Sequence, residues 1–412
     1  MQALRRQKPS LLSQTDFFEG LEERQLLATF SSVGTTLTLD LNVAGQIMSV
    51  YSNGSNYTFM LSGGATNSWS GTAGSGLSAN GATLTANSTA LSNFNLFNIT
   101  DSANNTGVFF GNSGVNTYGD NFNITLDNNS SVVTFNGSTS FSGSNNLTIL
   151  TDSRVELPSA SSLTMANGNL RMDINTQAVP RVLNYSGLMV NNATIQTTGN
   201  GTTNITARGG VGSVSTFLNK GVAVVEGGKI LGGTTGTMTI TGYGYTGVDG
   251  GLYGQGVYVM NINGNPISKI SSIGANVSVT GYGANSTNAT LSLSACVVNA
   301  GVVLGGQTTV GGTGGGCITS GGNGTVTVTG YGGTLANQPA SINGFCYGVY
   351  LNGSGTTITS GGAGLVTVLG YGGGANANTI GGMGVNVYCG TITSGNNGRS
   401  WSMARAAPRP AA

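Results

Sequence analysis

The C-terminal half of the chain repeats one unit, and an internal repeat constrains the fold more strongly than any other feature of a sequence. Each unit opens with Gly-Val, continues through a segment such as ITSGG, and closes with an alternating run that ends in Gly-Tyr-Gly. A weaker copy starts at Gly187, with Arg208 at the tyrosine position, and a last one starts at Gly384 and breaks off. The four clear units start at Gly221, Gly256, Gly301 and Gly348.

Apolar residues occupy every second position within a unit. In TVTVTGYG, valine alternates with threonine, as expected for a strand with one buried face. Gly-Gly and Asn-Gly pairs separate the runs and supply the positive φ values that sharp corners need. Three short strands in roughly 25 residues make one coil of a parallel β-helix, which buries its apolar face by stacking on the next coil. We therefore predict an all-β, right-handed parallel β-helix.

The composition agrees with a packed all-β chain. The 71 glycines and 7 prolines make 78 of the 412 residues, below the share of about 25–30% that marks low-complexity disorder. Charged residues make up 7% and the net charge is +1, so no charge pattern indicates nucleic acid or an anionic membrane as a partner. No run of 18 apolar residues occurs, so no helical membrane span is predicted.

The sequence divides into four parts. Residues 1–30 hold eight of the 27 charged side chains, which indicates a short helix or a sorting segment outside the solenoid. Residues 31–180 are rich in β-formers but irregular, and we expect early coils or a cap there. Residues 181–398 carry the repeat. Residues 399–412 (RSWSMARAAPRPAA) break the pattern, and we expect a disordered or aberrant tail.

One aromatic residue recurs at the same place in each unit. Stacked identical residues are a common way to fill a repeated position, so we predict a structural aromatic ladder. A row for stacking sugars is the functional alternative. Between GYG and the next GV lie 11, 17, 15 and 11 residues, which we expect to project from one corner as a binding surface. The residues of the ladder are Tyr243, Tyr282, Tyr331 and Tyr371.

Residue types that metal and cofactor sites need are scarce. The chain has no histidine, which excludes His-based triads and His-ligated zinc. GGNGTVTVT and GGAGLVTVL resemble a calcium-binding nonapeptide, but Val326 and Val366 stand where that motif needs aspartate. We predict no metal, cofactor or catalytic residue. We interpret the four cysteines as small buried hydrophobes, with an occasional disulfide as the alternative: Cys296, Cys317, Cys346 and Cys389.

Acidic residues are too few and too scattered to indicate an active site. The closest grouping is DSRVE, where Asp152, Arg154 and Glu156 are expected to share one solvated face of a strand. A carboxylate pair formed in space across coils stays open as an alternative. Two other pairs show no sign of convergence: Asp120 with Asp127, and Lys220 with Glu226.

The segment LEERQLL resembles the Leu-Glu-Pro-Arg-x-Leu-Leu motif near the amino terminus of large planctomycete surface or secreted proteins. Glu23 stands where that motif has proline. The Gly/Thr/Asn-rich body, with FNITLDN and VTVTGYGG, is similar to the β-helical repeats of those proteins and of filamentous-haemagglutinin-like adhesins. The resemblance implies export or surface display, a structural or adhesive role, and no enzymatic activity. The matching residues are Leu21, Glu22, Arg24, Leu26 and Leu27.

We therefore expect a non-enzymatic solenoid, extracellular or on the cell surface, that acts as an adhesin or as a matrix or envelope component. Its expected partners are cell-surface or extracellular polysaccharide or protein, with residues 1–30 read by export machinery. We expect no nucleic acid partner and no cofactor. The competing hypothesis is a carbohydrate-active β-helix enzyme, a polysaccharide lyase or glycosidase, with a dispersed acidic site.

Overall fold

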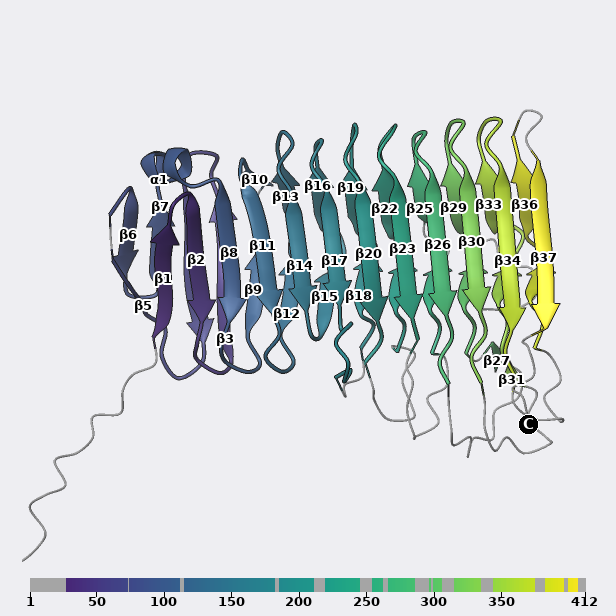
Figure 1. The fold of residues 1–412 in the computed structure, drawn as a ribbon, viewed down its shortest axis with the longest axis horizontal. Helices are drawn as coiled ribbons and strands as arrows, with labels where there is room; N and C mark the ends of the chain where they lie inside the picture. Colours follow the sequence, from purple (N-terminus) through teal and green to yellow (C-terminus); the bar gives the residue numbers. More distant parts are fainter. Residues whose placement is uncertain are drawn as a thin grey trace, which may run out of the picture.

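Three long sheets run side by side along an elongated parallel β-helix (Figure 1). Sheets A and B each have 13 strands and sheet C has 9, and in the solenoid body each sheet gains one strand per coil, while β27 (Cys296–Val297) and β31 (Gly344–Phe345) form a separate two-stranded sheet. The predicted fold class is therefore confirmed. This computed structural model describes residues 27–72, 74–111, 115–181, 185–210, 219–244, 254–261, 266–285, 296–297, 299–305, 315–334, 344–374, 382–395 and 399–406.

Each coil contributes one strand to each sheet, in the order A, B, C. Sheet A contains β2 (Thr36–Leu41), β8 (Leu96–Asp101), β11 (Asn121–Leu126), β14 (Leu147–Thr151), β17 (Leu170–Ile174), β20 (Thr203–Arg208), β23 (Met238–Tyr243), β26 (Val277–Tyr282), β30 (Val326–Tyr331), β34 (Val366–Gly372) and β37 (Ser400–Ala406). Sheet B contains β3 (Gln46–Ser52), β9 (Gly107–Phe110), β12 (Val132–Phe135), β15 (Arg154–Leu157), β18 (Leu188–Asn191), β21 (Val222–Val225), β24 (Val257–Met260), β28 (Val302–Gly305), β32 (Val349–Asn352) and β35 (Val385–Tyr388). Sheet C contains β10 (Val115–Tyr118), β13 (Ser138–Phe141), β16 (Ser162–Met165), β19 (Thr194–Thr197), β22 (Lys229–Gly232), β25 (Ser268–Ser272), β29 (Gly316–Ser320), β33 (Thr357–Ser360) and β36 (Thr391–Ser394).

Strand alternation decides which side chains fill the interior. In β30, Val326 and Val328 are fully buried, while Thr327 and Thr329, which alternate with them, face outward and are half-buried. Parallel pairing in register puts each inward residue on the equivalent residue of the next coil, so the core is built of columns. In sheet C one such column is isoleucine in five successive coils, all fully buried: Ile195, Ile230, Ile270, Ile318 and Ile358.

The N-terminal end of the rod is closed by antiparallel strands and a short helix (Figure 1). β3 pairs with β4, and β4 with β7, in antiparallel ladders, while β1 turns back along β2. The helix α1 begins after Asn87, whose side chain accepts from the backbone N–H groups of Thr89 and Ala90. The elements of this cap are β1 (Ala28–Val33), β4 (Tyr57–Gly63), β5 (Trp69–Gly71), β6 (Leu77–Asn80), β7 (Thr83–Ala86) and α1 (Ser88–Asn93).

Glycines explain why the repeat reads GYG and then GV. The A–B corner is the turn from a sheet A strand to the next sheet B strand. There, a Cβ added at Gly330 would lie 1.9 Å from the carbonyl oxygen of Gly348, so only glycine permits this approach of two backbones. In the first coils the same inward position of sheet A carries a side chain instead, such as Leu41, Leu126 or Ile174. Three further glycine pairs make the same contact, Gly242 with Gly256, Gly281 with Gly301, and Gly370 with Gly384.

Asparagines form a second ladder, at the corner where sheet C leads into sheet A. Asn121 Oδ1 accepts from the backbone N–H of Asn146 at 2.9 Å, and Asn146 Oδ1 accepts from that of Asn169 at 2.9 Å. Asn169 Oδ1 in turn accepts from the backbone N–H of Thr202 at 3.0 Å. Each side chain thus replaces a backbone acceptor for the coil above, which satisfies donors that the turn leaves unpaired.

The C-terminal segment differs from the prediction. A disordered or aberrant tail was expected over 399–412; the disorder is wrong for Ser400–Ala406, which form β37 and pair with β34 in parallel register. The edge of β34 offers a row of backbone donors and acceptors, and an extended segment can pair with them whatever side chains it carries. The apolar alternation is lost there, because Ser400 and Ser402 take the register positions of Val366 and Val368. Residues 407–412 lie outside the described residues.

Candidate functional site

The sorting motif lies almost wholly outside the part of the chain that the structure describes. This holds for Leu21, Glu22, Arg24 and Leu26, and for the predicted short helix. Leu27 is described; it is half-buried and directly precedes β1, where Ala28 and Phe30 are buried. The motif and the fold therefore meet at Leu27. The sorting role stays a prediction.

The four repeat tyrosines stack on the outer face of sheet A. Tyr243 and Tyr282 have ring centroids 4.7 Å apart with planes 5° from parallel, and the next two steps are 4.8 Å each. The register of β23, β26, β30 and β34 imposes this spacing, because it superposes the tyrosines coil by coil. Burial and the neighbouring phenols Tyr243 and Tyr331 raise the pKa of Tyr282 above its usual value. The rings therefore form one continuous column.

The stacking leaves little ring surface for a ligand. Each inner ring has both faces covered by its neighbours, so a sugar ring cannot lie on those faces. The outer face of Tyr243 is covered by the Arg208 guanidinium, 5.4 Å from the ring centroid. What the ladder offers outward is a row of ring edges and hydroxyl groups. This geometry favours the structural interpretation of the ladder over a sugar-stacking row.

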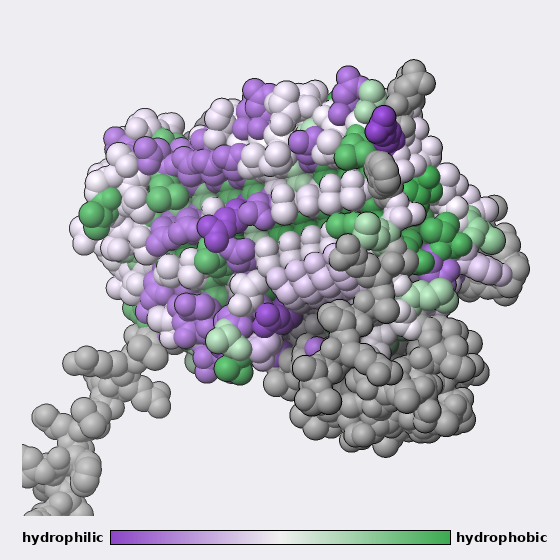
Figure 2. Space-filling model, turned by 45° about the vertical axis from the view of Figure 1, so that its right-hand side comes forward, coloured by the Kyte–Doolittle hydropathy of each residue, from purple (hydrophilic) through white to green (hydrophobic). Residues whose placement is uncertain are grey.

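Two columns of small polar side chains run beside the tyrosine ladder on sheet A. They face outward because they alternate with the buried valines and isoleucines of the same strands. Parallel register repeats each column from coil to coil. Figure 2 shows near-white, moderately polar residues in regular rows along the rod. One column is Asn204, Thr239, Ser278, Thr327 and Thr367; the other is Thr206, Thr241, Thr280 and Thr329, and it ends where Leu369 takes the next register position.

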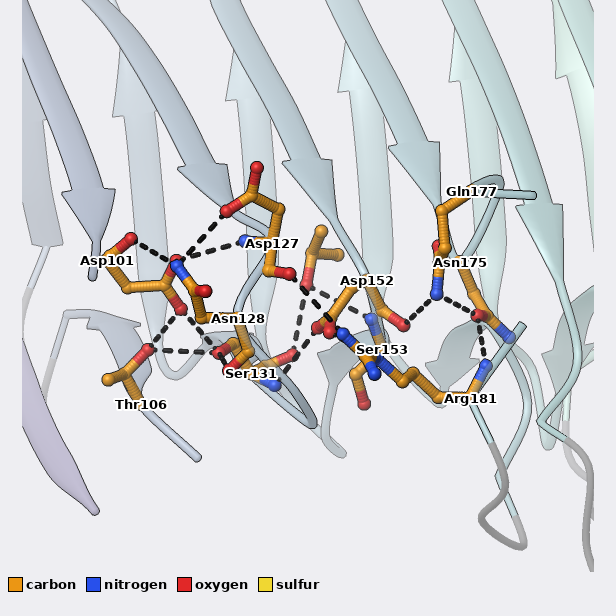
Figure 3. A network of polar contacts seen from close by, with 11 residues as sticks. Asp101, Thr106, Asp127, Asn128, Ser131, Asp152, Ser153, Asn175, Gln177 and Arg181 are labelled. Carbon is orange, nitrogen blue, oxygen red and sulfur yellow. Dashed lines mark hydrogen bonds and ion pairs between the residues drawn. The ribbon is translucent and has the colours of Figure 1, made fainter. Parts of the chain in front are cut away.

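A buried polar network occupies the A–B corner of the early coils (Figure 3). Asp101, at the end of β8, is only 7% exposed, at an inward position where the strands on either side carry leucine. Its Oδ2 accepts from the hydroxyl of Thr106 at 2.8 Å and from that of Ser131 at 2.6 Å. Its Oδ1 accepts from the backbone N–H of Asp127 at 3.0 Å. Both oxygens of Asp101 are therefore bonded within the corner.

Asp152 continues this network two coils further on (Figure 3). It is 3% exposed, and its Oδ2 accepts from Nε of Arg181 at 2.6 Å. Its Oδ1 accepts from the backbone N–H of Ser131 at 3.2 Å, which joins Asp152 to the residues around Asp101. Arg181 is itself held by Asn175, whose Oδ1 accepts from the backbone N–H of Arg181 at 2.9 Å. The network thus ties together four successive coils.

The chemistry of the network is that of a structural brace. Asp101 and Asp152 are buried and their oxygens accept hydrogen bonds from the protein, so neither presents a carboxylate to a substrate. Asp127 is the exposed carboxylate of this corner. Among the described residues, no group of three or more His, Cys, Asp or Glu side chains is placed to hold a metal ion.

The grouping expected in DSRVE is wrong for Asp152. Arg154 and Glu156 do share the outer face of β15 and form an ion pair at 2.6 Å. Asp152 precedes the strand and turns inward to Arg181, because the chain bends at the corner before β15 begins. The pairing was not visible in the sequence, since 28 residues separate Asp152 from Arg181 and only coil register brings them together.

The other two charged pairs flank single strands, Asp120 and Asp127 lying at the two ends of β11. Asp120 accepts from the hydroxyl of Tyr57 at 2.7 Å, and burial raises the pKa of its carboxyl. Lys220 and Glu226 flank opposite ends of β21. Lys220 is 4% exposed, its Nζ lies 4.6 Å from the centroid of the Tyr258 ring, and burial lowers its pKa to about 7.

The cysteines whose side chains are described carry free thiols. Cys346 is buried, Cys317 is half-buried and Cys389 is exposed. Burial raises the pKa of the Cys346 thiol to about 12, so it behaves as a small hydrophobe. The side chain of Cys296 lies outside the described part. In the described ranges, no helix is long and apolar enough to cross a membrane.

The chain matches no protein-family model, no curated protein and no solved structure.

Proposed function

We propose that the protein is a non-enzymatic β-solenoid, exported or displayed at the cell surface, with an adhesive role or a structural role in an envelope or matrix. The observation that carries the proposal is the outer face of sheet A, where threonine, with one serine and one asparagine, recurs from coil to coil at two register positions. Such a surface offers many similar, weak sites along a line. An extended polymer engages several of them at once, so weak contacts add up to firm binding.

The chemistry of this face indicates the kind of partner. Its columns are hydroxyl and amide groups with the edges of the stacked tyrosines beside them, and the chain as a whole carries a net charge of +1. Hydroxyls and amides both donate and accept hydrogen bonds, which suits the hydroxyls of a polysaccharide or the backbone of an extended protein segment. We propose these as the partners, in an extracellular or cell-surface location.

The resemblance of residues 21–27 to the planctomycete motif supports export. Leu27, the last residue of this motif, directly precedes β1. We propose that export machinery reads this segment and that the solenoid is the cargo. Membership of the planctomycete type of surface protein is part of this proposal.

The competing hypothesis is a polysaccharide-cleaving enzyme. Such enzymes use two carboxyl groups that face the same glycosidic bond. In the described part of the chain, the carboxylates that do gather, at the A–B corner, are mostly buried and bonded to Arg181, Ser131 and Thr106. Because the oxygens of these buried carboxylates already accept hydrogen bonds from the protein, they support a protein that binds a polymer without cleaving it.

A glycan and matrix-protein array, followed by analysis of the bound polymer for cleavage products, tests the proposal. We expect binding without products. Replacing Thr280 by lysine interrupts a column of sheet A and is expected to weaken binding about tenfold, equivalent to about 1.4 kcal/mol. Thr319→Lys, on the outer face of sheet C, is the matched control and should bind as the unmodified chain does. Equal loss in both variants would contradict the assignment of sheet A, and cleavage of any polymer would contradict the function.

A further inference from the structure

The outer face of sheet A is flat between β20 and β34. Figure 1 shows these strands of sheet A side by side and running in nearly the same direction. The ring planes of the tyrosine ladder differ by only 4–5° at each of three successive steps. Neighbouring strands of a sheet usually twist by about 20–25°, and side-chain ladders are one device that keeps a sheet flat. Successive coils of this face are therefore related almost by translation alone.

Threonine side chains form a two-dimensional net on this flat face. Along the rod, the net repeats every 4.7–4.8 Å, which is the ring spacing of the adjoining tyrosine ladder. Along one strand, outward residues such as Thr239 and Thr241 are two positions apart, about 6.6–6.8 Å. A third column precedes the strands and widens the net, and each of its residues accepts a backbone hydrogen bond from the previous coil. It contains Thr202, Thr237, Asn276 and Thr325.

The hydroxyl groups of this net are available to water. In the described part of the chain, those of Thr239, Thr280 and Thr329 make no hydrogen bond to the protein. The β-branched side chain of threonine is stiff about χ1, so its hydroxyl and methyl groups lie at fixed places that recur in each coil. The two columns contain no charged residue, and they begin next to the ion pair of Arg171 with Asp173. Water bound to this face is therefore held at the period of the net.

In the described coils, the other two sheets carry no such net. Lys229 and Lys269 interrupt an outward column of sheet C. The hydroxyls of Thr319 and Thr359, also on sheet C, each donate at 3.3 Å to the backbone carbonyl of the next residue. One outward column of sheet B is apolar or aromatic: Ala223, Tyr258, Val303 and Tyr350.

A rectangular net of hydroxyl groups at these two spacings matches ice. The prism face of hexagonal ice is itself a rectangular net of water oxygens. One of its repeats is close to the spacing of strands, and the other is close to the distance between alternate residues of a strand. Immobilising a water molecule costs up to about 2 kcal/mol, so a surface that already orders its water at these positions avoids part of that cost when the water joins a crystal.

We infer that the outer face of sheet A, from β20 to β34, binds ice through its threonine columns. Each hydroxyl contributes a weak contact by donating to or accepting from a water molecule of the crystal. The contacts add along the rod, because one rigid face engages all of them together. The inference goes beyond the proposed function and does not depend on it, since no polymer takes part.

The first test measures the freezing and melting points of a single ice crystal in a solution of the full chain, with no polymer present. We expect crystal growth to stop over a gap between these two temperatures, and the gap to widen with protein concentration. Thr280→Lys puts a long charged side chain in the middle of the net and should narrow the gap several-fold. Thr319→Lys, on the outer face of sheet C, is the matched control and should leave the gap unchanged.

The second test grows ice slowly from the solution and compares the concentration of the chain in the ice with that in the remaining liquid. We expect the unmodified chain to be enriched in the ice, whereas a growing crystal excludes ordinary solutes. Thr239→Lys, at an exposed threonine of the neighbouring column, should abolish the enrichment. Circular dichroism checks that each variant keeps its coils, which we expect because the replaced side chains face outward.

Four results would overturn the inference: freezing and melting points that coincide at every concentration, exclusion of the unmodified chain from ice, a gap that Thr280→Lys leaves unchanged, or an equal loss in Thr319→Lys. These outcomes are separate from those of the polymer array, in which no ice is present. A chain that binds a polymer but is excluded from ice contradicts the ice-binding face alone. A chain that enters ice but binds no polymer contradicts the proposed function alone.

Discussion

Replacing Gly348 by alanine tests the glycine contact that explains the repeat. A Cβ at this position would lie 2.4 Å from the nitrogen of Tyr371, 2.5 Å from the carbonyl oxygen of Gly384 and 2.7 Å from that of Gly330. Carbon atoms in proteins rarely approach such atoms closer than about 3.0 Å, so the corner has to open by about 0.6 Å. The crowding atoms belong to the backbones of three strand ends, so no side-chain rotation relieves them.

Overpacking a core by one methyl group costs about 1–3 kcal/mol, and backbone contacts place Gly348→Ala at the upper end, about 3 kcal/mol. Urea unfolding followed by circular dichroism measures the loss. Hydrogen exchange locates it, because in a stacked solenoid the coils around β32 open first.

Gly107→Ala is the matched control, since Gly107 precedes Val108 in β9 as Gly348 precedes Val349 in β32. The nearest atoms to its Cβ would lie 3.6 Å away, an ordinary contact, and we expect a change within about 0.5 kcal/mol. An unchanged stability of Gly348→Ala, or an equal loss in Gly107→Ala, would refute the close-approach explanation of the repeat.

Asp152→Ala leaves Arg181 without its partner and should lower stability by about 2–4 kcal/mol in urea unfolding, whereas Arg171→Ala, at an exposed ion pair, should cost under about 1 kcal/mol. Tyr282→Ala removes two stacking contacts and should cost about 1–3 kcal/mol, while Tyr282→Phe keeps the rings and should cost little. Burial lowers the pKa of Lys220 from 10.5 to about 7, so between these pH values the unfolded chain binds more protons than the folded chain. The free energy of unfolding should therefore rise with pH across that window, by on the order of 1 kcal/mol per pH unit. Lys220→Met should abolish this rise. Removing residues 1–26, which spares Ala28 and Phe30 of β1, should abolish export of a tagged chain; unchanged localisation would disprove the sorting role.

The repeated half of the fold was predictable because its information is local. Alternating valine and threonine in TVTVTGYG determines which face is buried, and the same period in successive units determines register. The stacking of Tyr282 on Tyr331 follows from that register. The reason for the repeated glycines was not predicted. The sequence indicated glycines that allow positive φ values at turns, whereas glycine is required at Gly330 because another backbone approaches it closely.

The early coils and the two ends were less predictable, because their contacts depend on partners remote in sequence. The burial of Asp101 depends on hydroxyls supplied by Thr106 and Ser131, and no local pattern marks them as its partners. The antiparallel cap depends on the hairpin of β3 and β4. The composition of these two strands is like that of the other strands in the irregular region, so it does not show that they pair antiparallel. β37 lacks the apolar alternation altogether and is a strand because the edge of β34 accepts it.

The central claim is that this rod binds an extracellular polymer and leaves it intact. The most direct measurement incubates the full chain with a panel of extracellular polysaccharides and matrix proteins, and follows both the bound fraction and the length of each polymer over time. We predict saturable binding that Thr280→Lys weakens, with polymer length unchanged. Shortening of any polymer by the unmodified chain, or binding to none of them, would contradict the claim.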